Sequence, residues 1–301
     1  MNPIPWCVVS KKFARNPMDL PYLAYFDLKE EPFSTVPSPR YLFLTPVHAT
    51  ALAKTQFIVE TKKGLTVIFG ETGMGKSSLA RLLHQKFLDR GLNSILLTNP
   101  NYPIPNALLR TIIQEFQLPR TARSYKDNLD LFKAYLYDQA LKQGKTVVLI
   151  IDEAQTLRFP LLELLRQLIN YETNEQKLLQ MVLFAQDELR VKLAHARGRS
   201  FRSRIAMAST LDRLGLEETR KMIVFRWQVA SAGNAHPFEP GAAEAIFKHS
   251  EGIPREANIL ADNSLLLAYL KKQKKVTRKI IEETARERRE TLAAPKKRHE
   301  R

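Results

Sequence analysis

The sequence has little cysteine and no long apolar run. Its single cysteine, Cys7, excludes an internal disulfide, and its six histidines are scattered, with no Cys and His cluster at the spacing of zinc ligands. We therefore expect a reducing compartment and no structural metal. Apolar runs such as Val147 to Ile151 are far shorter than the ~20 residues that a membrane span requires, and the N-terminus lacks the order of a signal peptide. These absences predict a cytoplasmic protein without a membrane partner.

Acidic residues are scarce relative to basic ones. The 301 residues include 31 Asp and Glu against 47 Lys and Arg, which gives a net charge of +16. Half of this surplus lies between Lys271 and Arg301, where 13 basic residues stand against five glutamates. Such an excess favours a polyanionic partner, nucleic acid or an anionic surface, although a solvated helix with a basic tail has the same composition. We interpret the surplus as contact with a polyanion.

The stretch GETGMGKSS, residues 70–78, fits the pattern G-x-x-x-x-G-K-[ST]. Glycines allow a turn whose amides point inward, and the start of the following helix adds a positive dipole end, so the loop can hold a polyphosphate. An apolar run before the loop and a helical pattern after it agree with this interpretation. The predicted nucleotide-binding residues are Gly70, Thr72, Gly73, Gly75, Lys76, Ser77 and Ser78, with Lys76 on the phosphates and Ser77 on Mg²⁺.

A second motif is the apolar run that ends in Asp152 and Glu153. A buried strand that delivers two acids beside a phosphate loop supplies one carboxylate for Mg²⁺ and one to activate water. Asp152 as a helix cap is the alternative, but it does not account for two successive acids. The run at residues 181–185 ends in Gln186, which we expect at the same edge of the sheet, near the γ-phosphate or its attacking water. A turn residue is the alternative there.

Arginines gather before the last strand pattern of the chain. Arg197, Arg199, Arg202 and Arg204 lie within eight residues. A guanidinium can stabilise the charge that develops during phosphoryl transfer, so one of them could act on a nucleotide held by a neighbouring subunit. A basic surface loop is the alternative, and the spacing does not select one arginine.

The order of strand and helix patterns predicts an α/β fold with a parallel sheet flanked by helices over residues 25–213, after an N-terminal arm at residues 1–24. Residues 25–46, rich in proline, are expected to run extended. A basic loop is expected at residues 120–126, before a helix at 128–144. From residue 214 only helical patterns follow, which predicts a small helical lid domain to residue 292 and a basic tail at residues 293–301.

Six stretches occur in an order that resembles one group of ATPases. They are YFDLKEEPFSTVPSPRYLFLTP, GETGMGKSSL, VVLIIDEAQTL, KLLQMVLFAQDEL, LGLEETRKMI and HSEGIPREANILAD. These stretches resemble the ExeA/GspA group of bacterial AAA+ ATPases, to which TnsC-type transposition regulators are related. The resemblance runs from about residue 25 to residue 285. It implies a P-loop AAA+ core with a helical lid, and hydrolysis of ATP with Mg²⁺.

The resemblance also implies roles for single residues. Lys76 and Ser77 would bind phosphate and Mg²⁺, Asp152 would bind the metal, and Glu153 would activate water. Gln186 falls at the sensor-one position of this group.

Two arginine positions that act on the nucleotide in this group have candidates in the sequence. Arg202 or Arg204 matches the trans-acting arginine, and Arg255, in the stretch GIPR, matches the sensor-two position of the lid. Such arginines would make ATP a bridge between the subunits of a homo-oligomer.

Secretion proteins of the ExeA type typically continue into a membrane span and a cell-wall-binding region, and this sequence has neither. With the net charge of +16, this difference favours a TnsC-type protein, an ATP-dependent regulator that oligomerises on duplex DNA as a ring or filament and links a target-selection protein to a transposase. Arg120, Arg123 and Lys126 are the candidate contacts to DNA phosphates. The alternatives are a secretion-associated ATPase without its anchor and a nucleotide switch that does not hydrolyse.

Overall fold

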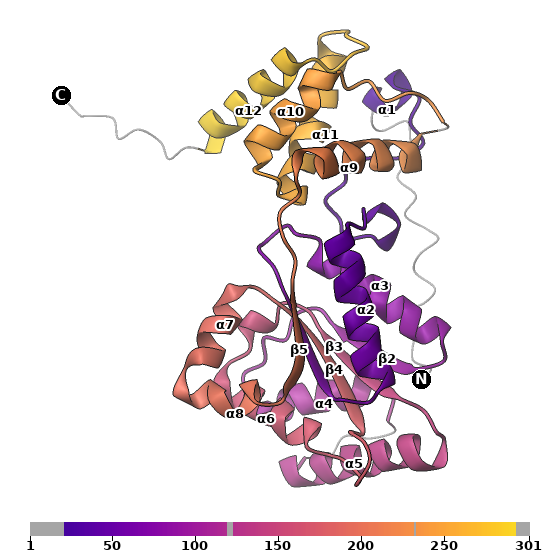
Figure 1. Cartoon of the computed structure of the whole chain (residues 1–301), viewed down its shortest axis with the longest axis vertical. Coiled ribbons are helices and arrows are strands. Elements are labelled where there is room, and N and C mark those ends of the chain that lie inside the picture. The colour runs from indigo at the N-terminus through magenta and orange to yellow at the C-terminus, as the bar shows by residue number, and fades with distance from the viewer. Residues whose placement is uncertain (1–20, 119–122, 232, 293–301) are drawn as a thin grey trace, which may run out of the picture. The chain divides into compact units, whose positions relative to one another are not determined.

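The computed structural model describes residues 21–118, 123–231 and 233–292. It divides into two compact units (Figure 1). The first is residues 37–213, and the second combines the described residues up to Val36 with those from Leu214 onward. The change from an α/β pattern to a helical one therefore coincides with a boundary between units. Of the N-terminal arm expected at residues 1–24, residues 1–20 lie outside the described residues, as does the basic tail at residues 293–301.

A parallel sheet forms the centre of residues 37–213, as the sequence predicts. The described residues contribute five strands in the order β2-β3-β4-β1-β5. The strands are β1 (Leu65–Phe69), β2 (Asn93–Leu97), β3 (Val147–Ile151), β4 (Leu179–Ala185) and β5 (Ile205–Thr210). The four strands from β1 to β4 are built from apolar runs, as is typical of a parallel sheet that is covered on both faces.

The register of the strands fixes which loops meet at one edge. Phe69 at the end of β1 is paired with Ala185 at the end of β4 and with Thr210 at the end of β5. Ile151 at the end of β3 is paired with Leu97 at the end of β2. Because all pairs are parallel, the residues that follow these strands gather at the carboxyl edge of the sheet, where ligands bind in open α/β folds.

Helices cover both faces of the sheet (Figure 1). On one face, α2 (Pro46–Glu60) and α3 (Lys76–Asp89) bury side chains against Ile68 and Phe184. On the other face lie α4 (Pro105–Glu115), α5 (Tyr125–Tyr137) and α6 (Phe159–Ile169). Shorter elements of this unit are η3 (Pro39–Tyr41), η4 (Asp138–Lys142), η5 (Ala154–Thr156), α7 (Asp187–Ala194), η6 (Ala196–Gly198) and α8 (Arg199–Arg202).

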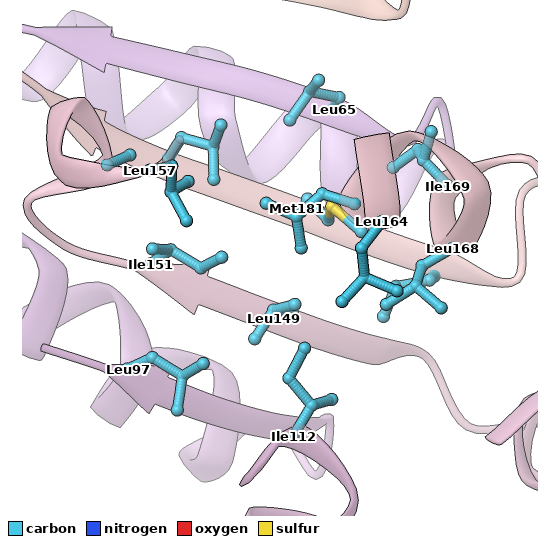
Figure 2. Packing of buried hydrophobic residues seen from close by; sticks show 14 of the residues in the cluster. Leu65, Leu97, Ile112, Leu149, Ile151, Leu157, Leu164, Leu168, Ile169 and Met181 are labelled. Atoms are coloured by element: carbon cyan, nitrogen blue, oxygen red, sulfur yellow. The ribbon is translucent and has the colours of Figure 1, made fainter. Parts of the chain in front are cut away.

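Figure 2 shows how the second of these faces is packed. Leu149 and Met181 of the sheet lie in one cluster with Leu164 and Leu168 of α6, and Ile112 of α4 lies below Leu149 in this view. These side chains are withdrawn from solvent. Fully burying a large aliphatic side chain contributes about 1.5–3 kcal/mol, so this layer holds the strands, and hence the loops at their carboxyl ends, in fixed register.

The second unit is helical. Its helices are α9 (Leu216–Ala230), α10 (Pro240–Ser250), α11 (Pro254–Leu270) and α12 (Arg278–Leu292), together with α1 (Pro21–Tyr25). The boundary predicted at residue 25 is wrong, because residues 21–36 pack on this helical unit and not on the sheet. The buried Arg226 side chain donates to the carbonyls of Pro32 and Ser34, at 2.8 and 2.7 Å, and Tyr22 donates to Asp262 at 3.0 Å.

Three further local predictions differ from the structure. Residues 25–46 are not wholly extended, because they contain η3, with Pro39 at its first position. The helix expected from residue 128 begins at Tyr125, since Ser124 caps it by accepting from the amide of Asp127. Lys126 therefore lies on α5 and not in a loop.

Candidate active site

The phosphate loop joins β1 to α3. Gly75 has φ of +84° and stands directly before the first residue of α3, and Gly73 has φ of +86°. Residues with a Cβ rarely adopt these angles, which explains the glycines of the motif. The loop is anchored to the sheet because the amide of Gly70 donates to the carbonyl of Ala185 at 3.1 Å. The loop and the first turn of α3 also bring Thr72, Ser77 and Ser78 to this edge of the sheet.

Lys76 is a buried cation at the start of α3. It is only 5% exposed, and its Nζ donates to the carbonyls of Gly70 and Glu71, both at 2.8 Å. A buried ammonium is stable only where negative or strongly polar groups surround it. A polyphosphate fits this surrounding, because its oxygens would accept from the same ammonium and from the amides at the helix start.

Asp152 lies beside this loop, directly after β3. It is 3% exposed, and its Oδ1 accepts from the amide of Glu153 at 2.9 Å. Burial raises the pKa of the Asp152 carboxyl above its ordinary value, while hydrogen bonds from the Ser77 hydroxyl and the Glu153 amide act in the opposite direction. A buried carboxylate with a neighbouring hydroxyl is an oxygen donor set of the kind that Mg²⁺ takes alongside phosphate oxygens. The predicted proximity of Ser77 and Asp152 is therefore present.

The described residues contain no group of three or more His, Cys, Asp or Glu side chains that could hold a metal ion. Ser77 and Asp152 are the side chains that would hold Mg²⁺ at this site. When bound there, the ion would supply positive charge next to the phosphates.

Glu153 occupies the centre of a hydrogen-bonded network at the carboxyl edge. Its φ of +56° is a left-handed conformation that non-glycine residues seldom adopt. Its Oε2 accepts from Nε2 of Gln186 at 3.3 Å and from the amide group of Gln155. Oε1 of Gln186 in turn accepts from the hydroxyl of Thr72 at 2.7 Å. The structure thus brings Glu153, Gln186 and the phosphate loop together.

Gln155 and Lys192 are parts of this network that the sequence analysis missed. Oε1 of Gln155 accepts from the backbone amide of Gln186 at 3.1 Å, so one side chain connects the ends of β3 and β4. Nζ of Lys192 donates to the carbonyls of Gln155 and Leu157, and burial lowers the Lys192 pKa. Gln155 stood within the quoted stretch VVLIIDEAQTL, but its spacing from Glu153 does not show which atoms it bonds.

Arg213 also contacts the phosphate loop, and nothing in the motif indicated it. Its guanidinium forms two hydrogen bonds with the Glu71 carboxylate, Nε to Oε1 at 3.1 Å and a terminal nitrogen to Oε2 at 2.7 Å. This hydrogen-bonded pair lowers the pKa of Glu71. Because 142 residues separate the two side chains, only the fold brings them together.

Arg202 and Arg204 are not near the phosphate loop of their own subunit. Both are exposed and stand before Ile205, which pairs with Leu65 at the amino edge of the sheet. β5 has six residues, so its two ends are separated by about 20 Å at ~3.3 Å per residue. Arg204 lies close enough to lower the pKa of Glu172, whose ion pair with Lys177 is the larger cause.

The remaining predicted residues are spread over the molecule. Arg255 is exposed in the first turn of α11, in the helical unit. Arg123 and Lys126 are exposed at the start of α5, and Arg120 lies outside the described residues. Roles in binding nucleotide or DNA stay predictions for these four.

Several basic side chains of residues 271–292 form ion pairs or ring contacts within the helical unit. Lys271 pairs with Glu283, and Arg288 pairs with Glu256. Nζ of Lys274 lies 3.9 Å from the ring centroid of Tyr25. This part of the positive charge therefore stabilises the helical unit and is less available to a polyanion than the sequence suggested.

Comparisons with known proteins find relatives over the region that holds this site. Residues 59–193 match the family model of the AAA domain. The chain is 36% identical over 257 residues to General secretion pathway protein A of Aeromonas hydrophila. That match covers 85% of this chain and 46% of the relative, so the chain spans about half of the relative's length.

Solved structures share the fold at low sequence identity. The ORC2 protein of Aeropyrum pernix, in ADPNP and ADP complexes, has a TM-score of 0.65 at 18% identity, over 86% of this chain and 72% of that chain. The ORC1 protein of the same organism, in complex with DNA, has a TM-score of 0.62 at 15% identity, over 82% and 66%.

Among the described residues, no helix combines the length and the apolar character needed to cross a membrane.

The phosphate loop, the two acids after β3 and Gln186 after β4 meet at one edge of a parallel sheet, and the matched AAA domain includes all of them. The chain is a P-loop ATPase whose residues 59–193 are similar to the AAA domain and whose fold is shared by the ORC proteins of Aeropyrum pernix.

Proposed function

We propose that this ATPase is a regulator of transposition that assembles on duplex DNA, with ATP and Mg²⁺ held between neighbouring subunits. In this proposal Lys76 binds the phosphates, Ser77 and Asp152 bind Mg²⁺, and Glu153 accepts a proton from the attacking water. Gln186 orients that water from the end of β4. Hydrolysis controls how long the assembly persists, and the assembly links a target-selection protein to a transposase.

The position of Arg202 and Arg204 carries the assembly part of the proposal. Both side chains are exposed at the sheet edge opposite their own phosphate loop, so neither can act on a nucleotide bound there. An exposed guanidinium at the amino edge can instead contact the nucleotide of an adjacent subunit and stabilise the charge of phosphoryl transfer. Arg197 of the same cluster is less suited, because its guanidinium lies over the ring of Phe159 at 4.8 Å.

Charge supports duplex DNA as the template. The net charge of +16 favours a polyanion, and Arg123 and Lys126 are exposed at the start of α5. A structural neighbour, ORC1, was solved in complex with DNA. Contacts from lysine and arginine to phosphates give binding without sequence choice and with a steep dependence on salt.

A secretion-associated ATPase is the second candidate function. The 36% identity to General secretion pathway protein A favours it directly. The two candidates differ in their template: a transposition regulator forms nucleotide-dependent assemblies on DNA, and a secretion ATPase needs an envelope partner and no DNA. A transposase gene beside the gene of this protein would support the first candidate.

The first experiment is electron microscopy of the purified protein with duplex DNA, with and without a slowly hydrolysed ATP analogue, at two salt concentrations. We expect rings or filaments on DNA that require the analogue, shorten at high salt and disappear in Lys76→Ala. Nucleotide binding without any assembly on DNA at low salt would reject the DNA part of the proposal and favour the secretion ATPase.

Mixing two inactive variants tests whether the arginine acts across subunits. Lys76→Ala lacks a nucleotide site but keeps its arginines, and Arg204→Ala or Arg202→Ala keeps the site but lacks one arginine. If the arginine acts in trans, a site is complete only where an arginine variant holds the nucleotide and a Lys76→Ala subunit supplies the arginine. In an equal mixture, ATPase activity should therefore recover at about a quarter of the interfaces. Arg197→Ala is the matched control and should retain activity alone. No recovery in either mixture would reject the shared site.

A further inference from the structure

The chain that leaves the sheet after β5 is fastened to the phosphate loop at two successive points. The amide of Leu211 donates to the carbonyl of Phe69 at 2.8 Å, and the Leu211 side chain approaches Gly70 so closely that a Cβ on the glycine would lie 3.2 Å from Cβ of the leucine. Two residues later, Arg213 makes its two hydrogen bonds to Glu71 of the loop. We therefore expect residues 211–213 to move together with the phosphate loop.

The next residue is fastened to the helical unit. Leu214 is 4% exposed, and its amide donates to the carbonyl of Gly252 at 2.9 Å. Gly252 has φ of +76°, and a Cβ there would lie 2.2 Å from the carbonyl oxygen of Leu214, so the two backbones are in direct contact. α11 begins two residues after Gly252. We therefore expect Leu214 to move together with the helical unit.

We propose that Arg213 is a positioning residue that couples the phosphate loop to the helical unit through Glu71. The chain crosses between the units at two places, after Val36 and after Arg213. At the second crossing the connection is the bond between Arg213 and Leu214, because each side of that bond is held by a different unit. Holding Arg213 on Glu71 restricts the backbone dihedrals on either side of this planar peptide bond, and releasing it allows the helical unit to reorient. The proposal rests on the ATPase site and does not depend on DNA or a transposase.

Nucleotide would act on this ion pair through Lys76. The carbonyl of Glu71 accepts from Nζ of Lys76, and a polyphosphate competes for that ammonium. The phosphates also bring negative charge next to the Glu71 carboxylate, which changes its interaction with Arg213. Exposed ion pairs change an equilibrium by up to about fivefold, so the coupling is expected within that range.

The test measures the orientation of the helical unit with two fluorophores. Cysteines are introduced at Val191 on α7 and Leu270 on α11, two exposed positions in different units, with Cys7 replaced by serine. Energy transfer is recorded without nucleotide and with a slowly hydrolysed ATP analogue. Binding of a fluorescent ATP analogue is measured separately for each variant.

We expect the analogue to change the energy transfer of the wild type, and the change to be smaller in Arg213→Gln and Glu71→Gln. The double variant should equal either single variant, because both remove the same interaction. Arg213→Lys, which keeps the charge but not the paired geometry, should be intermediate. Nucleotide affinity should fall by no more than about fivefold in these variants.

Arg166→Gln is the matched control. Arg166 forms two hydrogen bonds with Glu163 on α6, at 2.8 and 2.6 Å, away from the phosphate loop, and its loss should leave the energy transfer unchanged. The proposal is overturned if the wild type binds the analogue without a change in transfer, if Arg213→Gln keeps the full change, or if the two single effects add in the double variant. Absence of nucleotide binding in the wild type would instead contradict the ATPase site.

Discussion

The hydroxyl of Thr72 donates to Oε1 of Gln186 at 2.7 Å, so the phosphate loop after β1 is bonded directly to the residue that ends β4. Nε2 of the same glutamine reaches Glu153. One amide side chain thus contacts the loop expected to hold the nucleotide and the carboxylate expected to activate water. Gln186 thus links the two partners, and substitutions in this network test the roles of its members.

Glu153→Gln should abolish hydrolysis while leaving nucleotide binding intact. The amide cannot accept a proton from water, and a positioned general base contributes typically 10²- to 10⁴-fold, so turnover should fall by about that factor. Phosphate release and binding of a fluorescent ATP analogue measure the two effects. If the variant and the wild type show the same low turnover, the protein is a nucleotide switch and the assignment of Glu153 is wrong.

Gln155→Ala should lower kcat with little change in KM. The Gln155 side chain holds the Glu153 carboxylate and the backbone of Gln186, and loss of such positioning reduces turnover by about ten- to a hundredfold. Gln155→Glu keeps the length of the side chain but removes its donor, and should lose at least as much. Gln143→Ala, which removes a surface hydrogen bond to Asp138, is the control. An equal loss in KM would indicate a role in binding instead.

In the absence of nucleotide, Asp152→Asn should raise the unfolding free energy of the protein. The same variant should not bind ATP with Mg²⁺. Burial raises the pKa of Asp152 in the folded state, so the folded chain binds its proton more tightly than the unfolded chain does. The stability from this group is therefore present at low pH and is lost as the pH rises above the ordinary Asp value of 3.8. Asparagine does not ionise, so at pH 7 the variant should gain about 1 kcal/mol, which is within the usual range for a stabilising substitution.

The pH dependence distinguishes this explanation from a general effect on packing. The difference in unfolding free energy between Asp152→Asn and the wild type should shrink as the pH falls below the ordinary Asp value of 3.8, because Asp152 is then protonated in both states. Urea unfolding at several pH values measures it. Asp130→Asn on the exposed face of α5 is the control. A gain that does not depend on pH would contradict the role of desolvation.

Gly252→Ala should destabilise the helical unit strongly. A left-handed residue with a Cβ costs about 1–2 kcal/mol, and at this position the Cβ also collides with the carbonyl of Leu214, so we expect a loss of more than about 2 kcal/mol. Gly233→Ala is the matched control: it has φ of +100° but no atom within 4 Å of the added Cβ, and should lose about 1 kcal/mol. Thermal unfolding of both variants tests the difference. Similar losses would mean that the contact with Leu214 relaxes easily.

Local patterns predicted the strands of the sheet well. The apolar run before the phosphate loop is β1, the run at residues 181–185 agrees with β4 within two residues, and β5 is the strand expected after the arginines. Buried parallel strands are short continuous apolar runs, which are visible in sequence. The helix α7 was not predicted, because its eight residues carry only a weak apolar pattern and two of them, Leu189 and Leu193, are buried.

Only the tertiary structure shows which unit residues 25–36 pack on. Their prolines indicated an extended chain, but the sequence does not say which unit this chain packs on. In the structure Arg226 binds the carbonyls of Pro32 and Ser34, and Phe33 packs on Phe238 with ring centroids 5.6 Å apart. These partners are about 200 residues away in the chain, so no local pattern could assign the segment to the helical unit.

The sequence by itself determined the phosphate loop, the acids after β3 and the α/β character of the ATPase unit. Each of these depends on neighbouring residues: glycines that permit a turn, apolar runs that form buried strands, and polar residues where the strands stop. Only the tertiary structure decided that Gln155 and Gln186 hold Glu153, that Arg213 reaches Glu71, and that Arg204 lies at the edge away from its own loop. Those relationships depend on the order and register of parallel strands, which join residues that are distant in the chain.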